Sequence, residues 1–344
     1  MTAFRKTSVA VAIACLLPAA PVLAQDSVTL KFAMAVPPGH YTAIHGGKFF
    51  MDRVTELSKG RIKFQWFPAE QLGKAKDMLA LVQTGVADMA DVVPSYTPDK
   101  LPLTGVSELP GQATSSCEGT AAYYAMTRPG QFLATKEFDA QKVRVLMAAP
   151  LVPYKIFTSN KQVARLEDMA GLKIRSSGGA SDTTVRSLGA VSVRLAGPDM
   201  HEALTRGTID GAMYPFISLK PFDLVGSIKY VIEGVSVGAV STTFVMSDAK
   251  YKSLAPDLQK VLDQAGKETG ENYCKYMDTQ ESKEKAALTT IKATELSDAE
   301  AARWRNVLAG VKEEWAKGLD DRGKPGKEAL AVWDQEIKKI RSKP

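Results

Sequence analysis

The N-terminal part of this chain repeats strand and helix patterns in turn, and this order constrains the fold more than any other feature. Residues 61–67 alternate strictly between polar and apolar side chains, which is typical of a half-buried strand. A helical pattern over 40–59 precedes this strand, and another over 76–84 follows it. Residues 28–35 and 86–93 predict two further strands. The repeated strand–helix–strand order indicates an α/β domain with a largely parallel sheet.

The same kind of pattern continues to the C-terminus. Further strands are predicted at 143–148, 155–160, 172–175, 209–213 and 231–246. A long helix should begin near Pro256 and run towards Lys285, although Gly266 within it weakens a helix by about 1 kcal/mol relative to alanine. Two more helices are predicted at 301–317 and 327–342. A length of 344 residues suggests about two domains.

Residues 1–24 have the pattern of a secretory signal peptide. Arg5 and Lys6 precede a short apolar core at 9–17, and a small-residue site predicts cleavage before Gln25. The apolar core is too short to span a bilayer. We therefore expect an exported protein.

Composition narrows the classes of partner. The chain is 45% hydrophobic, which supports a sizeable core, and its formal charge of +6 falls to +4 when Arg5 and Lys6 are removed with the leader. The mild positive charge suits an anionic ligand. No basic patch is interleaved with aromatic residues, so a nucleic-acid partner is not expected.

Two cysteines remain after the predicted cleavage, Cys117 and Cys274. Export would place them in an oxidising compartment, where such a pair can form a disulfide. Two separate buried thiols are the alternative, because the sequence does not show whether their Cα atoms approach within bonding range.

Residues 168–211 contain the most informative local pattern. A turn at Gly171 leads into a short predicted strand, Leu-Lys-Ile, that ends at Arg175. A short helix then ends at Gly207 and leads into the strand at 209–213. A planar guanidinium matches a carboxylate with two parallel hydrogen bonds and stays charged at physiological pH, so Arg175 is a candidate anion anchor.

These motifs together resemble the solute-binding proteins of TRAP transporters, the DctP-like family. The resemblance also includes Phe67-Pro68-Ala69 with Gln71-Leu72-Gly73, and Glu108-Leu109-Pro110. It implies a two-domain periplasmic binding-protein fold, α/β in class, in which each domain has a mostly parallel sheet flanked by helices. A long helix would span both domains.

The resemblance also implies how the chain divides after the signal peptide at 1–24. Domain I would comprise 26–151 and 239–279, and domain II would comprise 152–238 and 280–344. Ligand would bind in the cleft between the two domains.

The same resemblance assigns ligand contacts to several residues. Arg175 would bind the ligand carboxylate, and Lys155 stands where relatives carry a second, assisting arginine. Met213 and Tyr214 occupy a cleft segment in which other members carry asparagine or a glutamate–tryptophan pair. The apolar and aromatic character of this segment favours a ligand with an apolar or aromatic body. The alternative is that Met213 points into the core.

Two further candidates lie where predicted strands of domain I end. His40 follows the first strand, and Ser95 follows the strand at 86–93. Ligands of α/β sheets bind beyond the carboxyl ends of the strands. No acidic residue stands at 93–96, so the sequence gives no support for recognition of an amino group.

The sequence contains only weak motifs for catalysis or metal binding. His40 and His45 are not spaced as a helical metal pair, so neither a metal nor a cofactor is expected. Residues 234–238, Gly-Val-Ser-Val-Gly, match the esterase elbow in letters, but no histidine follows position 201, and a plain strand is the better interpretation. We therefore do not predict an enzyme.

The resulting hypothesis is a monomeric periplasmic binding protein of a TRAP transporter. It would capture a small organic monocarboxylate, such as an apolar or aromatic 2-oxo or 2-hydroxy acid, and deliver it to the membrane permease subunits. A binding protein of an ABC importer and an exported enzyme are the alternatives.

Overall fold

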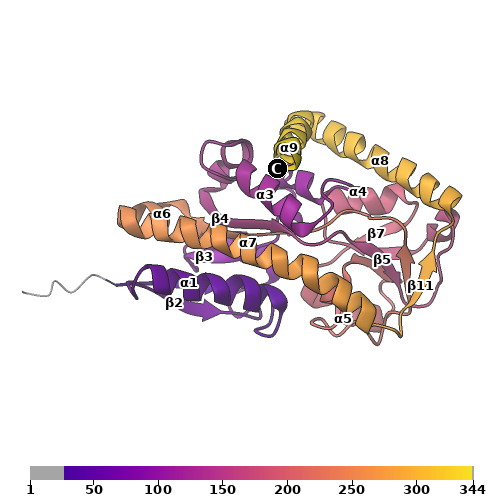
Figure 1. Ribbon diagram of the computed structural model, residues 1–344, viewed down its shortest axis with the longest axis horizontal. Coiled ribbons are helices and arrows are strands. Elements are labelled where there is room, and N and C mark those ends of the chain that lie inside the picture. The colour runs from indigo at the N-terminus through magenta and orange to yellow at the C-terminus, as the bar shows by residue number, and fades with distance from the viewer. Residues whose placement is uncertain (1–26, 343–344) are drawn as a thin grey trace, which may run out of the picture.

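The computed structural model describes residues 27–342, so the predicted signal peptide at 1–24 lies outside the described part (Figure 1). Two β-sheets form the framework. The first sheet has the strand order β2-β1-β3-β10-β4. Its strands are β1 (Val28–Ala33), β2 (Ile62–Phe67), β3 (Met89–Val92), β4 (Val143–Pro150) and β10 (Ser241–Ser247).

The second sheet has the order β11-β9-β5-β8-β6-β7. Its strands are β5 (Lys155–Thr158), β6 (Lys173–Ser176), β7 (Val191–Arg194), β8 (Gly211–Tyr214), β9 (Tyr230–Glu233) and β11 (Lys292–Glu295). Each sheet contains one antiparallel strand, which is β10 in the first sheet and β5 in the second. These are the strands that the chain enters directly after crossing between the sheets, and the predicted mostly parallel α/β architecture is confirmed.

Short helices connect and cover the strands of the first sheet. The predicted helix at 40–59 forms as a π-helical turn, η1 (Thr42–Lys48), followed by α1 (Phe49–Leu57). The predicted helix at 76–84 is α2 (Met78–Gln83), and α3 (Ser116–Met126) precedes β4. The Ser115 hydroxyl caps α3 by accepting the backbone N–H of Glu118.

The long helix α7 (Pro256–Ala287) spans both domains, as predicted (Figure 1). It packs on β4 and α3, and near its other end Glu281 accepts the backbone N–H groups of Phe216 and Ile217 in the second domain. Gly266 is needed here, because a Cβ at this position would clash with the Leu146 carbonyl of β4. The glycine therefore lets helix and sheet approach closely, which offsets its poor helix propensity.

The two cysteines form a disulfide, which resolves the question that the sequence left open. Cys117 in α3 is bonded to Cys274 in α7, with their Cα atoms 4.7 Å apart. Asp278, one helical turn further along α7, accepts the backbone N–H groups of Ser116 and Cys117. The start of α3 is thus held to α7 by both a covalent bond and hydrogen bonds.

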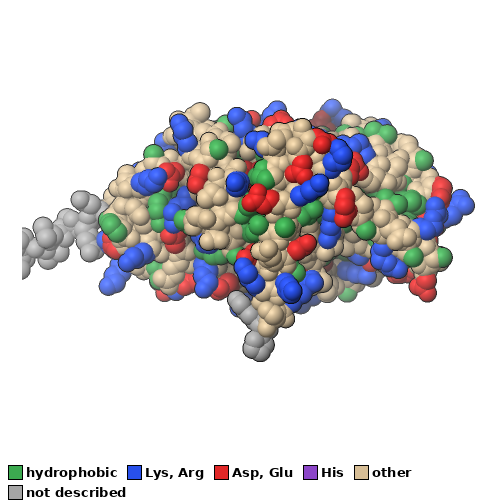
Figure 2. All heavy atoms as spheres, turned by 90° about the horizontal axis from the view of Figure 1, so that it is seen from above, with side chains coloured by type: hydrophobic (Ala, Val, Ile, Leu, Met, Phe, Trp, Pro, Cys, Tyr) green, Lys and Arg blue, Asp and Glu red, His purple; other side chains and the backbone are tan. Residues whose placement is uncertain are grey.

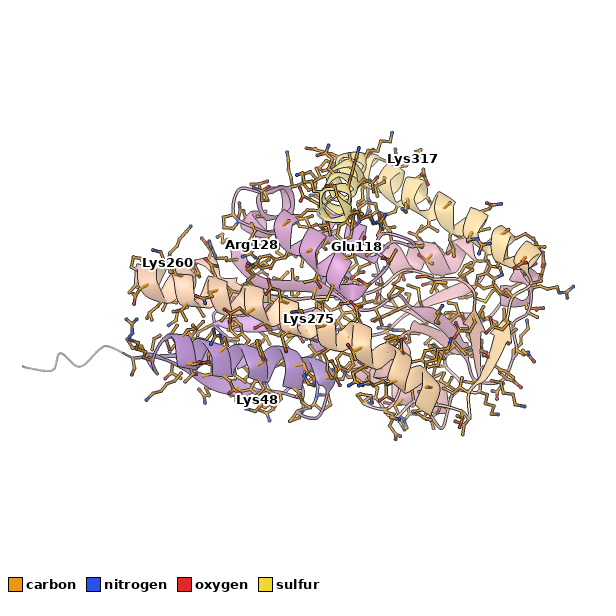
Figure 3. The ribbon with its side chains drawn as sticks, in the orientation of Figure 1. Lys48, Glu118, Arg128, Lys260, Lys275 and Lys317 are labelled. Carbon is orange, nitrogen blue, oxygen red and sulfur yellow. A yellow bond between two sulfur atoms is a disulfide. The ribbon has the colours of Figure 1, made fainter. Side chains whose placement is uncertain are left out.

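The domain boundaries inferred from the resemblance group residues 280–344 with domain II. Helix α8 (Asp298–Asp320) packs against α4 (Ala180–Ser187) of that domain. Helix α9 (Gly326–Arg341) instead lies against α3 of domain I, as Figure 1 shows. Glu118 of α3, labelled in Figure 3, forms an ion pair with Arg341 of α9. The C-terminal helices therefore cross from one domain to the other.

Residues 234–238 were predicted as a plain strand, and this prediction is wrong. They belong to the irregular segment that joins β9 to β10 and crosses between the sheets. Gly238 has a φ of +114°, and its carbonyl accepts the Tyr154 N–H at 2.7 Å. This segment and residues 150–154 form the paired crossings between the domains.

The surface carries charges of both signs. On the face seen in Figure 2, Lys and Arg side chains are interspersed with Asp and Glu side chains. Within residues 27–342, no helix has the length and apolar character needed to cross a membrane.

Candidate functional site

A small cavity of about 50 Å³ lies between the two sheets. Residues of the first domain and of the crossings form one wall: Val36, His40, Tyr41, Thr42, Asp91, Val93, Tyr96, Leu151, Val240 and Thr242. Residues of the second domain form the other: Tyr154, Arg175, Tyr214, Ser218 and Phe222. The structure therefore brings the predicted residues Arg175, Tyr214 and His40 together.

Arg175 lies at the end of β6, and its side chain is buried, with only 1% of the residue exposed. Its Nε donates to the Leu195 carbonyl at 2.9 Å, and Nη1 approaches the Met213 carbonyl at 3.4 Å. None of the ion pairs among the described residues involves Arg175. Burying a cation that has only neutral partners costs desolvation free energy. A bound anion would offset this cost, so the guanidinium is a candidate anion-binding group.

Tyr96 of the first domain reaches across to the second. Its hydroxyl accepts the backbone N–H of Gly197 at 2.9 Å and lies 3.5 Å from Arg175 Nη2. Next to it, Gly178 has a φ of +108°, and a Cβ there would clash with the Ser95 carbonyl. The domains are therefore in direct contact beside Arg175, and the structure represents a closed form.

Aromatic side chains form much of the cavity wall. The Tyr214 ring lies 5.8 Å from Tyr154 and 6.1 Å from Phe222, measured between ring centroids. The Arg175 guanidinium carbon is 5.2 Å from the Tyr214 centroid, within the range of a cation–π contact. Burial raises the pKa of Tyr154 and of Tyr214, so both phenols remain neutral at physiological pH. These flat, neutral walls suit an apolar or aromatic ligand body.

His40 is buried in the cavity wall between the rings of Tyr41 and Phe222, at centroid distances of 4.0 and 4.8 Å. Its Nδ1 accepts the backbone N–H of Thr42 at 3.1 Å. Burial lowers the pKa of His40 to about 3, so the imidazole is neutral and its proton resides on Nε2. That Nε2 is buried and has no hydrogen-bond partner among residues 27–342.

Asp91 is a cavity residue that the sequence analysis missed. It is buried in β3, and its Oδ1 accepts a hydrogen bond from the Thr242 hydroxyl of β10. Burial raises the pKa of Asp91 to about 6, although the Thr242 hydrogen bond acts in the opposite direction. The sequence analysis considered acidic residues only at 93–96, beyond the strand end. A carboxylate inside an otherwise apolar strand was the signal that could have identified it.

The other three predicted ligand residues do not line the cavity. Lys155 donates to the Val235 carbonyl at 2.9 Å and pairs with Glu233 at 3.4 Å. Met213 is buried in the core, and its carbonyl faces Arg175. Ser95 lies at the contact with Gly178.

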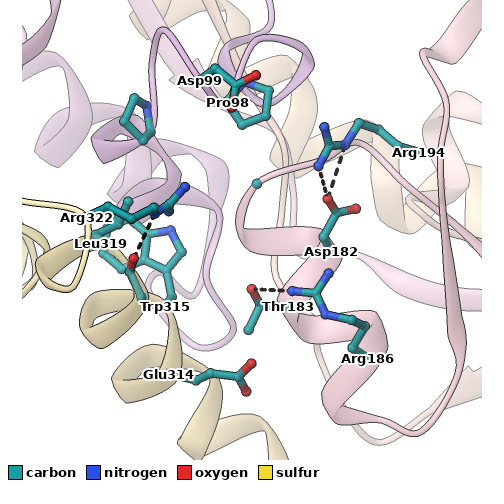
Figure 4. Close-up of a pocket in the computed structure, with 13 residues that line it drawn as sticks. Pro98, Asp99, Asp182, Thr183, Arg186, Arg194, Glu314, Trp315, Leu319 and Arg322 are labelled. Atoms are coloured by element: carbon teal, nitrogen blue, oxygen red, sulfur yellow. Dashed lines mark hydrogen bonds and ion pairs between the residues drawn. The ribbon is translucent and has the colours of Figure 1, made fainter. Parts of the chain in front are cut away.

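A second hollow of about 370 Å³ lies between the domains on the side of α8 (Figure 4). Three arginines line it, and each donates at least one hydrogen bond to a residue of the groove walls. Arg194 pairs with Asp182 at 2.5 Å, Arg186 donates to the Thr183 hydroxyl, and Arg322 donates to the Gly318 carbonyl. We call this hollow the Arg194 groove.

Groups of three or more histidine, cysteine or acidic side chains arranged for metal binding are absent from the part of the chain that the structure describes.

Two α/β domains, paired crossings between them and a cavity at their interface define a solute-binding protein of the periplasmic type. Comparison with known proteins identifies which kind. Residues 32–318 match the family of bacterial extracellular solute-binding proteins, family 7, also called DctP. The chain therefore belongs to this family, the solute-binding proteins of TRAP transporters.

Individual relatives agree with this assignment. A TRAP solute-binding protein from Rhodoferax ferrireducens, solved with copurified benzoate, is 26% identical, with a TM-score of 0.83 over 91% of this chain and 98% of the other. A marine metagenome protein described as specific for aromatic acid ligands, solved with 3-hydroxybenzoate, is 26% identical, with a TM-score of 0.84 over 91% and 99%. The C4-dicarboxylate-binding protein DctB of Bacillus subtilis is 25% identical over 86% of this chain and 81% of its own.

Proposed function

We propose that this protein is the periplasmic component of a TRAP transporter that captures an aromatic or apolar monocarboxylate and delivers it to the membrane permease. The observation that carries the proposal is the environment of Arg175. Its guanidinium is buried at the domain interface, faces a cavity and has only neutral partners. A ligand carboxylate would supply the missing charge through two charge-assisted hydrogen bonds.

The residues of the cavity wall support a ligand with an aromatic or apolar body. Tyr154, Tyr214 and Phe222 provide aromatic faces on the domain II side, and the remaining cavity walls are partly aliphatic. Two solved relatives with 26% identity hold benzoate and 3-hydroxybenzoate, which are both aromatic monocarboxylates. In this proposal Arg175 binds the carboxylate, while Tyr214 and His40 contact the ligand body.

A dicarboxylate is the competing ligand class, because one relative is named for C4-dicarboxylates. A second carboxylate needs its own cation to offset desolvation. Arg175 is the only lysine or arginine that lines the cavity in the described residues, and His40 is neutral. Lys155 is already paired with Glu233. The cavity therefore favours a single carboxylate.

A thermal-shift panel tests the proposal, because a ligand that binds only the folded state raises the melting temperature. The protein should first be unfolded and refolded without reductant to remove copurified acids. Benzoate, phenylacetate, mandelate and phenylpyruvate should be compared with succinate and malate. We expect shifts with aromatic monocarboxylates. Shifts with the dicarboxylates alone would overturn the proposed ligand class.

A further inference from the structure

Asp91 and His40 leave hydrogen-bonding capacity unused in the ligand cavity. Asp91 uses Oδ1 to accept from Thr242, while Oδ2 accepts none of the hydrogen bonds formed within residues 27–342. His40 uses Nδ1 to accept from Thr42, which leaves its Nε2–H without an acceptor. Both side chains are at least 95% buried and line the same small cavity. A spare acceptor and a spare donor therefore face one small space.

These two groups lie on the opposite wall from the carboxylate anchor. Asp91 belongs to β3 of the first sheet, and His40 follows β1 of that sheet. Arg175 belongs to β6 of the second sheet. A ligand whose carboxylate binds Arg175 would present its other end to Asp91 and His40.

Four kinds of ligand end can be compared against this donor–acceptor pair. A hydrocarbon end leaves both buried polar groups unsatisfied, which costs free energy. A second carboxylate accepts from His40 but repels Asp91. An ammonium donates to Asp91 but offers no acceptor to His40. A hydroxyl does both, because it donates one hydrogen and accepts on its oxygen.

We propose that this site selects acids that carry a hydroxyl group at the end remote from the carboxylate, with Asp91 accepting the hydroxyl hydrogen and His40 Nε2–H donating to its oxygen. The inference rests on the proposed function, in which Arg175 binds the carboxylate. It assigns specificity to the first domain and charge recognition to the second. A hydroxylated acid would bridge both domains through hydrogen bonds, and such bridging stabilises the closed state.

The test compares parent acids with their hydroxylated forms by calorimetry on the refolded, ligand-free protein. Benzoate and phenylacetate are each measured beside their 3-hydroxy and 4-hydroxy forms, and 3-(aminomethyl)benzoate supplies the ammonium. We expect at least one hydroxylated acid to bind about tenfold more tightly than its parent, as for a hydrogen bond to a charged group. Parents that bind as tightly as every hydroxylated form, or an aminomethyl form that binds most tightly, would overturn the inference.

Variants then assign the preference to a residue. Asp91→Asn keeps the side-chain shape but loses the anionic acceptor, and the tenfold ratio between the hydroxylated acid and its parent should fall below about threefold. Asp263→Asn, on the outer part of α7, is the matched control and should keep the preference. An unchanged preference in Asp91→Asn would overturn the assignment. The wild-type panel decides the ligand class even if Asp91→Asn does not fold.

The same panel separates this inference from the proposed function. If parents bind and hydroxylation adds nothing, only the inference about Asp91 and His40 fails. If no aromatic acid binds, the proposed ligand class fails and the inference fails with it.

Discussion

Two of the hollows at the domain interface, the cavity and the Arg194 groove, each contain an arginine, but one arginine is buried without a counter-charge and the other is exposed and paired. In the cavity Arg175 is 1% exposed and contacts two carbonyls and a phenol. In the Arg194 groove the Arg194 side chain is 55% exposed and pairs with Asp182 at 2.5 Å. The groove is larger, at about 370 Å³ against about 50 Å³.

The comparison argues against choosing a candidate binding site by its volume. An exposed, paired arginine is already neutralised and hydrated, so it gains little from a ligand. A buried arginine without a counter-charge gains much from one. The smaller hollow is therefore the better candidate, and the predictions below test that contrast.

The largest expected effect comes from removing the buried charge. Arg175→Ala should weaken binding of an aromatic monocarboxylate by about 100-fold or more, because the buried anion loses its partner. Arg175→Lys should also weaken binding, since a point charge replaces a planar fork. Calorimetry on both variants measures the losses.

Arg194→Ala is the matched control for this prediction. It removes an arginine from the groove, and the affinity should remain within about threefold of wild type, as for an exposed ion pair. Equal losses in Arg175→Ala and Arg194→Ala would remove the distinction between the two hollows.

The contact between the domains at Gly178 and Ser95 gives the next largest expected effect. Gly178→Ala would place a Cβ against the Ser95 carbonyl at a positive φ, so the domains could not close fully. Ligand affinity should fall by about tenfold or more, because closure then carries a strain of 1–3 kcal/mol or so. Small-angle scattering with ligand should show a more open molecule than wild type.

Gly189→Ala controls for the backbone strain alone. Gly189 also has a positive φ, of +84°, but no atom lies within 4 Å of the position of an added Cβ. We expect lower stability and nearly unchanged affinity. A comparable loss of affinity in both glycine variants would mean that strain, rather than blocked closure, is responsible.

Asp91 in the cavity and Asp182 in the Arg194 groove should contribute to the free energy of unfolding with opposite pH dependences. Burial raises the pKa of Asp91 to about 6 from an ordinary value of 3.8. For Asp182 burial also acts upwards, but hydrogen bonds from Ser176 and Arg194 outweigh it and lower the pKa. The folded protein therefore binds a proton at Asp91 more tightly than the unfolded chain does, and releases one from Asp182 more readily.

The free energy of unfolding should follow these shifts. The ionised Asp91 disfavours folding above pH 6, and this cost, about 2–3 kcal/mol, is relieved as the pH falls from 6 towards 4. The Asp182 contribution is present above pH 4 or so and is lost at lower pH. His40, with a pKa lowered to about 3, stays neutral in the folded protein, whereas the unfolded chain takes up this proton as the pH falls below 6.5. This lowers the free energy of unfolding of the wild type and of both Asp variants alike, so it cancels when a variant is compared with the wild type.

Denaturant titrations at several pH values measure this dependence. Asp91→Asn should be more stable than wild type at pH 7, and the difference should disappear by pH 4. Asp182→Asn should be less stable than wild type at pH 7. If the free energy of unfolding has the same pH dependence in the wild type and in Asp91→Asn, the raised pKa of Asp91 is contradicted.

The smallest expected effect is that of metal removal. Affinity for an aromatic monocarboxylate should be the same with and without EDTA, because Arg175 supplies the charge that a metal would otherwise provide. Calorimetry in the two buffers makes this comparison. A large loss of affinity after chelation would show that the anchor is not Arg175 alone.

The sequence predicted the framework well because local patterns determine it. The alternation at 61–67 and the apolar face that follows Pro256 correspond to β2 and α7. Arg175 was placed through a local pattern too, since a turn, a strand and an arginine are consecutive. The structure puts that arginine at the domain interface, as the resemblance implied.

The sequence does not reveal contacts between residues that are distant along the chain. Lys155 was assigned to the ligand, but its partner Glu233 comes from β9, which local patterns do not reveal. Asp91 was overlooked because alternation predicts that β3 is a strand but does not show which face meets a cavity. Residues 234–238 have strand-like composition, yet they form the crossing because two sheets have to be connected.

A crystal structure of the protein with benzoate would test the central claim most directly. The account predicts both carboxylate oxygens within about 3 Å of the Arg175 guanidinium, with the ring against Tyr214 inside the cavity. A benzoate bound instead in the Arg194 groove, or one in the cavity with its carboxylate turned away from Arg175, would contradict it.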